Sequence, residues 1–99
     1  MDTIYTFQQL RGLLSPLFRR YGIRRAVLFG SYAKGQASEH SDIDLLVDSG
    51  LSGLRFVGFL DDVQNAVGKE VDLFDIRHIE KGSPIDREIR ATGVTMYEQ

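Results

Sequence analysis

Short apolar runs alternate with segments of helical periodicity along this chain, and this alternation limits it to helices packed on a small sheet. Residues 26–29 form an apolar run that stops at Gly30, and residues 42–47, with two acids among apolar residues, form a second predicted strand before a glycine-rich loop. Runs of this length between turn residues are typical of buried strands. Residues 70–74 are predicted to form a third strand, and residues 94–97 to be extended.

The first helix is predicted from its capping signals. Thr6, with Gln9 three residues later, matches a capping box. Apolar residues then recur at helical spacing until Gly22. Pro16 is expected either to kink this helix or to restart it with Ser15 as a new cap.

Two further helices complete the predicted elements. Helical spacing over residues 54–67 ends at Gly68. Ser83 followed by Pro84 predicts a cap before a last helix at residues 85–91. The predicted fold class is therefore α+β, in the order αβαβαβ, with a small mixed sheet flanked by helices.

Composition limits both the class of protein and the chemical groups available for catalysis. Hydrophobic residues make up 42% and charged residues 26% of the 99 residues, which fits one globular domain over residues 1–99. No apolar run approaches the ~20 residues of a membrane span and no signal peptide is visible, so we expect a cytoplasmic protein without a membrane partner. The chain has no cysteine, so catalysis must rely on oxygen and nitrogen groups.

Charge is unevenly distributed, although the net charge is only −2. Residues 1–38 hold six Lys/Arg and one acid, whereas residues 39–99 hold six Lys/Arg and thirteen acids. A basic half can attract phosphate or an acidic partner surface, or it can be a solvated helix face. The near-neutral total disfavours a dedicated nucleic-acid-binding protein, so no direct nucleic-acid partner is expected.

The turn at Gly30-Ser31 is a candidate phosphate-binding site. Residues 31–35 are predicted to form a turn or a short helix after the first strand. The backbone N–H groups at the start of such a turn have no partner and can bind an anion. The Ser31 hydroxyl adds a further donor, although a Gly-Ser pair taken alone is a common turn.

Asp42 and Asp44 are candidate metal ligands. Residues two apart on a strand point to the same face, about 6.5–7 Å from each other, while Ile43 points into the core. Two facing carboxylates repel each other unless a cation neutralises them, and Mg²⁺ prefers such ligands together with phosphate oxygens. Asp72 would join them if the third strand lies beside the second, and Asp75 is the weaker rival. The structural alternative is an acid pair that only caps a neighbouring turn.

The spacing of these residues resembles a known signature. Gly30-Ser31, ten intervening residues and then Asp42 and Asp44 resemble the motif of the polymerase-beta-like nucleotidyltransferase superfamily. The chain is most similar to the minimal nucleotidyltransferases, a group that includes the antitoxins of HEPN/MNT toxin–antitoxin pairs. The resemblance implies the nucleotidyltransferase fold, with the Gly-Ser turn holding the nucleotide triphosphate. It also implies that both strand acids bind Mg²⁺, and that Asp72 completes the metal site and helps to deprotonate the acceptor.

Lys34 marks a departure from the family pattern. Such sequences commonly show Ala-Arg-Gly where this chain has Ala33-Lys34-Gly35. Lysine keeps the charge but lacks the bidentate fork of arginine. Lys34 is therefore expected either to contact a phosphate or to be an exposed surface lysine. His40 and His78 have no suitably spaced partner and are expected to lie on the surface.

By resemblance, the chain is a Mg²⁺-dependent enzyme that transfers AMP from ATP to a hydroxyl, by similarity a tyrosine, of a partner HEPN toxin. Two alternatives remain open: a non-catalytic antitoxin that acts by occlusion, and a small-molecule transferase similar to aminoglycoside nucleotidyltransferases. The short chain disfavours the latter because little room is left for an acceptor-binding domain. The implied catalytic and metal residues are Asp42, Asp44 and Asp72, and the implied nucleotide-binding residues are Gly30, Ser31 and Lys34.

Overall fold

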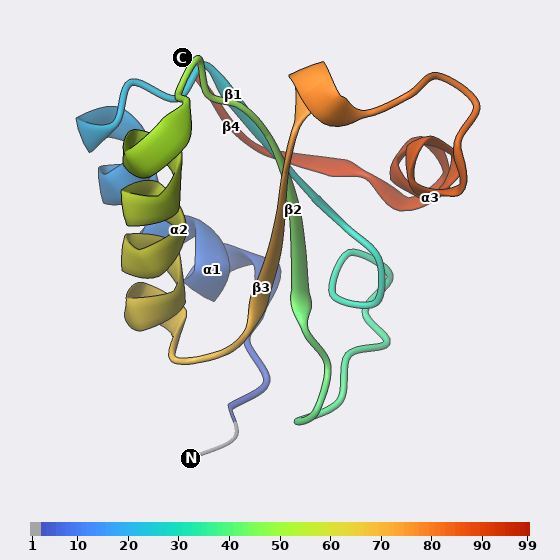
Figure 1. Ribbon diagram of the computed structural model, residues 1–99. Helices are drawn as coiled ribbons and strands as arrows, with labels where there is room; N and C mark the ends of the chain where they lie inside the picture. Colours follow the sequence, from blue (N-terminus) through green and yellow to red (C-terminus); the bar gives the residue numbers. More distant parts are fainter. Residues whose placement is uncertain (1–2) are drawn as a thin grey trace.

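The chain folds into a four-stranded sheet with helices on both sides (Figure 1). The computed structural model describes residues 3–99. Along these residues the elements follow in the order α1 (Phe7–Arg20), β1 (Arg25–Phe29), β2 (Ile43–Asp48), α2 (Gly53–Val67), β3 (Val71–Asp75), the 3-10 helix η1 (Ile76–His78), α3 (Pro84–Thr92) and β4 (Val94–Glu98).

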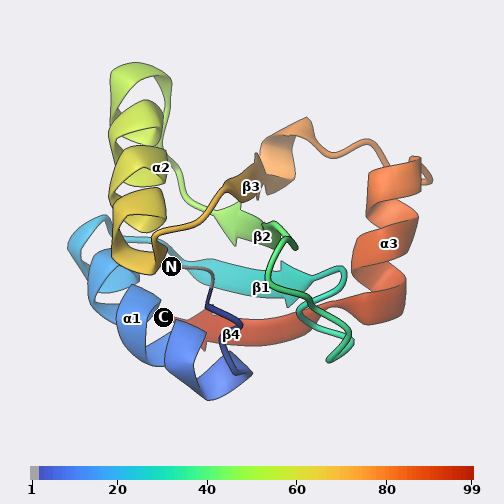
Figure 2. The same cartoon turned by 90° about the horizontal axis from the view of Figure 1, so that it is seen from below.

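The sheet is mixed, with the strand order β3-β2-β1-β4. β1 is antiparallel to both of its neighbours, whereas β2 and β3 are parallel. Parallel neighbours need a crossover connection, and α2 provides it between the end of β2 and the start of β3. Helices α1 and α2 cover one face of the sheet, and α3 lies on the other side (Figure 2).

Alternation along the strands separates the core from the opposite face. In β2, Ile43, Leu45 and Val47 are buried together with residues of α1 and α2, while the residues between them are only half-buried. Successive strand residues point to opposite faces, so Asp44 and Leu46 belong to the face that carries α3. The strand pattern therefore places the apolar core on one side and the strand acids on the other.

Helix α1 confirms the predicted capping box and corrects the expected restart at Pro16. Thr6 Oγ1 accepts a hydrogen bond from the Gln9 N–H (3.1 Å), and the Gln9 side chain accepts one from the Thr6 N–H (2.8 Å). The helix continues through Pro16 to Arg20, and Ser15 is an interior residue, not a new cap. The Ser15 hydroxyl instead donates to the Arg11 carbonyl (2.6 Å). Burial of the apolar stripe outweighs the backbone hydrogen bond that Pro16 cannot make.

The connection between β1 and β2 is a turn without a regular helix. Its backbone closes through a hydrogen bond from the Lys34 N–H to the Gly30 carbonyl (3.1 Å). The observed order is consequently αββαβαβ, which differs from the expected αβαβαβ, while the small mixed sheet flanked by helices is confirmed. Strand β2 begins at Ile43, one residue later than predicted. Within residues 3–99, no helix has the length and apolar character that crossing a membrane requires.

Candidate active site

Asp44 and Asp72 lie side by side because β2 and β3 pair in parallel with these two residues in register. Paired residues of neighbouring strands project to the same face, and the strands are about 4.8 Å apart. The two carboxyl groups are close enough for Asp72 to contribute to the raised pKa of Asp44. The strand adjacency on which the assignment of Asp72 depended is thus confirmed.

The electrostatics of Asp44 are strongly perturbed. Burial, the neighbouring Asp72 and the charges of Asp42 and Glu88 raise the pKa of Asp44 from 3.8 to about 6. Burial removes water from the charged form, and each nearby carboxylate disfavours a further negative charge. The site therefore concentrates negative charge at one point of the sheet face, where a cation would be stabilised.

Asp42 contributes to this cluster from a more open position. It directly precedes β2, and its side chain is exposed. Among the described residues, no three His, Cys, Asp or Glu side chains form a ready-made metal-binding group. The structure accordingly places Asp44 and Asp72 side by side, while Asp42 acts on Asp44 through its charge.

Gly30 is the residue that allows the turn to approach these acids. Its φ of 75° lies in the left-handed region, and a Cβ at this position would collide with Asp44 Oδ2. Both constraints favour glycine, which has no side chain and tolerates positive φ. The carboxylate of Asp44 consequently lies directly against the backbone of the Gly-Ser turn.

The turn after Gly30 presents free donors. The Gly30 N–H itself donates to Thr92 Oγ1 of α3 (2.9 Å). Within residues 3–99, no acceptor meets the backbone N–H groups of Ser31, Tyr32 or Ala33. Three consecutive free N–H groups at the start of a helical turn form an anion-binding arrangement. The donors predicted for this turn therefore begin at Ser31, since the N–H of Gly30 is already used.

Lys34 lies at the far end of the same turn. Its Nζ is 3.9 Å from Glu88 Oε1 of α3, and both side chains are partly exposed. A pair of this length between partly exposed groups is weak, so the lysine can exchange one anionic partner for another. Lys34 is thus an exposed lysine beside Glu88, whose charge also acts on Asp44.

Two residues beside the site, Glu88 and Thr92, were not found from the sequence. They are one helical turn apart on α3, so both face the Gly-Ser turn. The spacing within α3 was visible in the sequence. The strand against which this helix packs was not, because that contact joins segments about sixty residues apart.

Comparison with known proteins decides the family. The sequence profile described as polymerase beta, nucleotidyltransferase, matches residues 13–99. The chain belongs to this nucleotidyltransferase family. The matched range includes the Gly30-Ser31 turn and the acids Asp42, Asp44 and Asp72.

Sequence relatives of this nucleotidyltransferase are named as protein adenylyltransferases. Protein adenylyltransferase MntA of Thermococcus cleftensis is 35% identical over 74 residues, which cover 69% of this chain and 75% of the relative. A candidate protein adenylyltransferase of Methanocaldococcus jannaschii is 36% identical over 73 residues, covering 72% of this chain and 78% of the relative.

Solved structures share the nucleotidyltransferase fold. A minimal nucleotidyltransferase candidate is 26% identical, with a TM-score of 0.73 over 91% of this chain and 95% of that chain. A toxin–antitoxin crystal structure with AMP-PNP is 22% identical, with a TM-score of 0.76 over 90% and 73% of the two chains. The complex of tri-AMPylated Shewanella oneidensis HEPN toxin with MNT antitoxin is 20% identical, with a TM-score of 0.71 over 95% and 74%.

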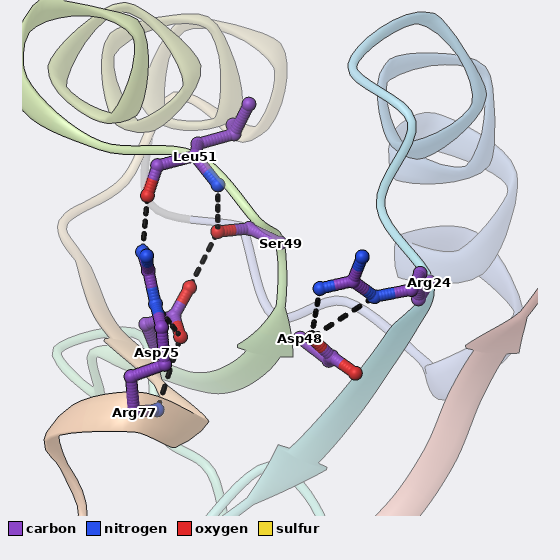
Figure 3. A network of polar contacts seen from close by, with 6 residues as sticks. All are labelled: Arg24, Asp48, Ser49, Leu51, Asp75 and Arg77. Atoms are coloured by element: carbon purple, nitrogen blue, oxygen red, sulfur yellow. Dashed lines mark hydrogen bonds and ion pairs between the residues drawn. The ribbon is translucent and has the colours of Figure 1, made fainter.

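Asp75 lies outside the acidic cluster of the nucleotidyltransferase. The residue is only 1% exposed, and it lies on the opposite face of β3 from the exposed Asp72. Burial opposes ionisation, but hydrogen bonds from Ser49 and from the backbone and side chain of Arg77 outweigh it and hold the pKa of Asp75 below its ordinary value. Figure 3 shows this network, in which the Arg77 side chain also donates to the Leu51 carbonyl. Asp75 therefore ties the end of β3 to the loop after β2.

The two histidines lie on the surface of the nucleotidyltransferase, as predicted. His40 is exposed, with Nε2 3.5 Å from Glu39 Oε1. His78 is also exposed and ends η1. Neither belongs to a group of side chains arranged to hold a metal within the described residues. The chemistry of the site consequently rests on carboxylates and on the donors of the turn.

Proposed function

We propose that this chain is a Mg²⁺-dependent protein adenylyltransferase that transfers AMP from ATP to a tyrosine hydroxyl of a partner HEPN-type toxin, and so acts as its cytoplasmic antitoxin. The observation that carries the proposal is the pairing of Asp44 with Asp72 directly against the Gly30-Ser31 turn. Family membership and the names of the relatives support the same reaction. No direct nucleic-acid or membrane partner is part of the proposal.

In this proposal the turn binds the triphosphate. Ser31 supplies its hydroxyl and backbone N–H, and Gly30 gives the phosphates access to the backbone. Lys34 exchanges its weak contact with Glu88 for a phosphate oxygen. Free N–H groups, a hydroxyl and a mobile ammonium are the donors that a polyphosphate requires.

Asp42, Asp44 and Asp72 are the proposed metal ligands. The donor set consists of carboxylate oxygens, which suits Mg²⁺, and the raised pKa of Asp44 reflects charge that a cation would offset. When bound, the ion would neutralise charge on the phosphates. The fit between the acidic cluster and the neighbouring donors supports a bound ATP–Mg²⁺ pair.

The proposed chemistry is one substitution at phosphorus. The tyrosine oxygen of the acceptor forms a bond to the α-phosphorus of ATP, the bond from that phosphorus to the bridging oxygen breaks, and pyrophosphate leaves. The hydroxyl proton passes to the carboxylate of Asp72, which is the exposed member of the pair. A tyrosine hydroxyl has an ordinary pKa of about 10, so a nearby base is needed near neutral pH.

The proposal is tested by incubating the chain with its cognate HEPN protein, Mg²⁺ and ATP labelled at the α-phosphate. We expect covalent label on the partner, lost with Asp44→Asn and retained with Asp61→Asn, an exposed acid on α2. Label that stays absent although a stable complex forms would favour the alternative of neutralisation by occlusion. Label that Asp44→Asn does not reduce would contradict the assigned site.

A further inference from the structure

Helix α3 holds the phosphate-binding turn from the face opposite the core. We propose that Thr92 is a positioning residue for this turn, in which its hydroxyl fixes the backbone of Gly30 and thereby the donors that follow. The inference rests on the proposed function, because it concerns how the same nucleotide site is held. Thr92 touches neither substrate nor metal in this scheme and acts through Gly30.

The hydroxyl of Thr92 is held at both of its hydrogen-bonding functions. It accepts from the Gly30 N–H (2.9 Å) and donates to the Glu88 carbonyl one turn earlier in α3 (2.8 Å). A hydroxyl whose own proton is engaged cannot rotate freely, so its lone pairs keep one direction. The Gly30 N–H therefore faces an acceptor with a fixed orientation.

Gly93 explains why α3 can end so close to β1. Its φ of −61° is ordinary, yet an added Cβ would lie only 3.0 Å from Val27 Cγ1 and would also press on the Ile89 carbonyl. Available space, and not backbone conformation, therefore favours glycine at this position. The absent side chain lets the end of the helix lie against the strand, which brings Thr92 to the N–H of Gly30.

The turn is attached to α3 at both ends. Gly30 is bound by Thr92, and Lys34, whose N–H closes the turn on the Gly30 carbonyl, faces Glu88. Only the first attachment is short and well directed, and Gly30 is buried. Removing the Thr92 hydroxyl would leave a buried N–H without its acceptor, which destabilises that backbone geometry.

The consequence for nucleotide binding follows from preorganisation. The free N–H groups of Ser31, Tyr32 and Ala33 can bind one common ligand only while the turn keeps this conformation. If the turn samples other conformations, the apparent dissociation constant rises by the inverse of the competent fraction. The acids that would carry the chemistry belong to β2 and β3 and keep their own register. Loss of the Thr92 hydroxyl should thus weaken ATP binding more than it slows turnover.

The test compares Thr92→Val, which keeps the side-chain shape, with Thr92→Ser, which keeps the hydroxyl. Thr95→Val, at an exposed position of β4, is the matched control. With Mg²⁺ and ATP, Thr92→Val is expected to raise the dissociation constant and the KM for ATP about three- to tenfold with a much smaller change in kcat. Thr92→Ser should restore most of the affinity, and Thr95→Val should match the parent chain. Amide hydrogen exchange at Gly30 should accelerate in Thr92→Val alone.

The outcomes separate this inference from the proposed function. If Thr92→Val lowers Tm but leaves ATP affinity and KM unchanged, Thr92 is only a structural residue and the inference is overturned. Failure of Thr92→Ser to recover affinity, or an equal loss with Thr95→Val, also overturns it. If the parent chain binds no ATP with Mg²⁺, the proposed function fails. Faster amide hydrogen exchange at Gly30 in Thr92→Val would then still show that the Thr92 hydroxyl holds the Gly30 N–H.

Discussion

At the scale of single residues, the proposed chemistry of the site depends on Asp44. The strand pattern places it on the face opposite the core, Gly30 leaves the space that its carboxylate occupies, and the register places Asp72 at its side. Burial and the neighbouring carboxylates make the ionised form of Asp44 unfavourable unless a cation compensates its charge. A carboxylate in this position lowers the stability of the free protein and favours the binding of a cation.

Replacing Asp44 with Asn should therefore stabilise the metal-free chain in a pH-dependent way. The folded pKa of about 6 lies above the ordinary 3.8, so wild-type stability falls as the pH rises through this interval and stays reduced above it. In EDTA, Asp44→Asn should melt above the wild type at about pH 7–8. The difference should shrink as the pH falls through about 6 toward 4. A lower Tm for the variant at neutral pH would make Asp44 a structural acid.

Asp72 and Asp75 are predicted to fail in different assays, although they lie three residues apart. Asp72→Asn removes the proposed base, so AMP transfer should fall about 10²- to 10⁴-fold while the fold persists. Asp75→Asn disturbs a buried carboxylate bonded by Ser49 and Arg77, so the free energy of unfolding should fall by about 1–3 kcal/mol. Residual transfer per folded molecule should be kept. Urea unfolding and labelled-ATP transfer, measured on both variants, distinguish the two roles. The reverse pattern would show that Asp75, and not Asp72, is the third acid of the site.

The residues found from the sequence are those with a local signal. The Gly-Ser turn and the acids Asp42 and Asp44 at the start of β2 could be proposed because a few neighbouring positions carry the whole pattern. Asp72 was ranked above Asp75 from alternation and from the family resemblance, and the parallel register supports that order. Thr92 and Glu88 could not be identified, because their roles arise only when α3 packs beside β1.

At the scale of elements, the two long helices begin differently. In α1, Thr6 accepts from the Gln9 N–H at the cap, and Tyr5 before it packs on the core and donates to the Val67 carbonyl (2.6 Å). In α2, Ser52 occupies the cap position but makes no side-chain cap hydrogen bond. The start of α1 is thus fixed by polar and apolar contacts, and that of α2 by backbone conformation and the preceding loop.

The cap difference predicts unequal costs of alanine substitution. Thr6→Ala should lower the free energy of unfolding by about 1 kcal/mol, because a hydrogen bond to an otherwise unpaired N–H is lost. Ser52→Ala, the matched control, should cost only a few tenths of a kcal/mol, within the range of surface substitutions. Chemical denaturation of both variants measures the difference. Equal losses would show that the cap hydrogen bond of α1 contributes nothing specific.

Whether a segment forms a helix or a strand was predictable where its apolar periodicity agrees with the capping and turn residues at its ends. Ser83 caps α3 and Pro84 occupies its first turn, as expected, and Gly68 ends α2 with a φ of 65°. Of the two outcomes expected at Pro16, a kink or a restart, the restart is wrong, because the propensity of one residue was weighed without the buried stripe around it. Strand pairing was beyond the sequence pattern, since alternation identifies the buried face of a strand but not its neighbour.

At the scale of the whole molecule, ligand binding is predicted to stabilise the fold cooperatively. Mg²⁺ with ATP should raise Tm more than the sum of the two separate effects, because phosphates and carboxylates would share the ion. At one hundred times the dissociation constant the gain is about 2.7 kcal/mol. Thermal melts with ATP in Mg²⁺ and in EDTA provide the measurement. Equal protection in both conditions would rule out the metal role of the three acids.

The parallel pairing of β2 with β3 also governs when the site comes into being. Asp44 and Asp72 belong to strands that meet only after the chain has passed through α2 and returned to the same end of the sheet. Contacts between distant segments carry the larger loop-closure entropy and tend to form late in folding. We expect a folding intermediate that holds only the β1–β2 hairpin to lack the acid pair. Bound nucleotide would then leave the folding rate unchanged and would stabilise the protein by lowering its unfolding rate.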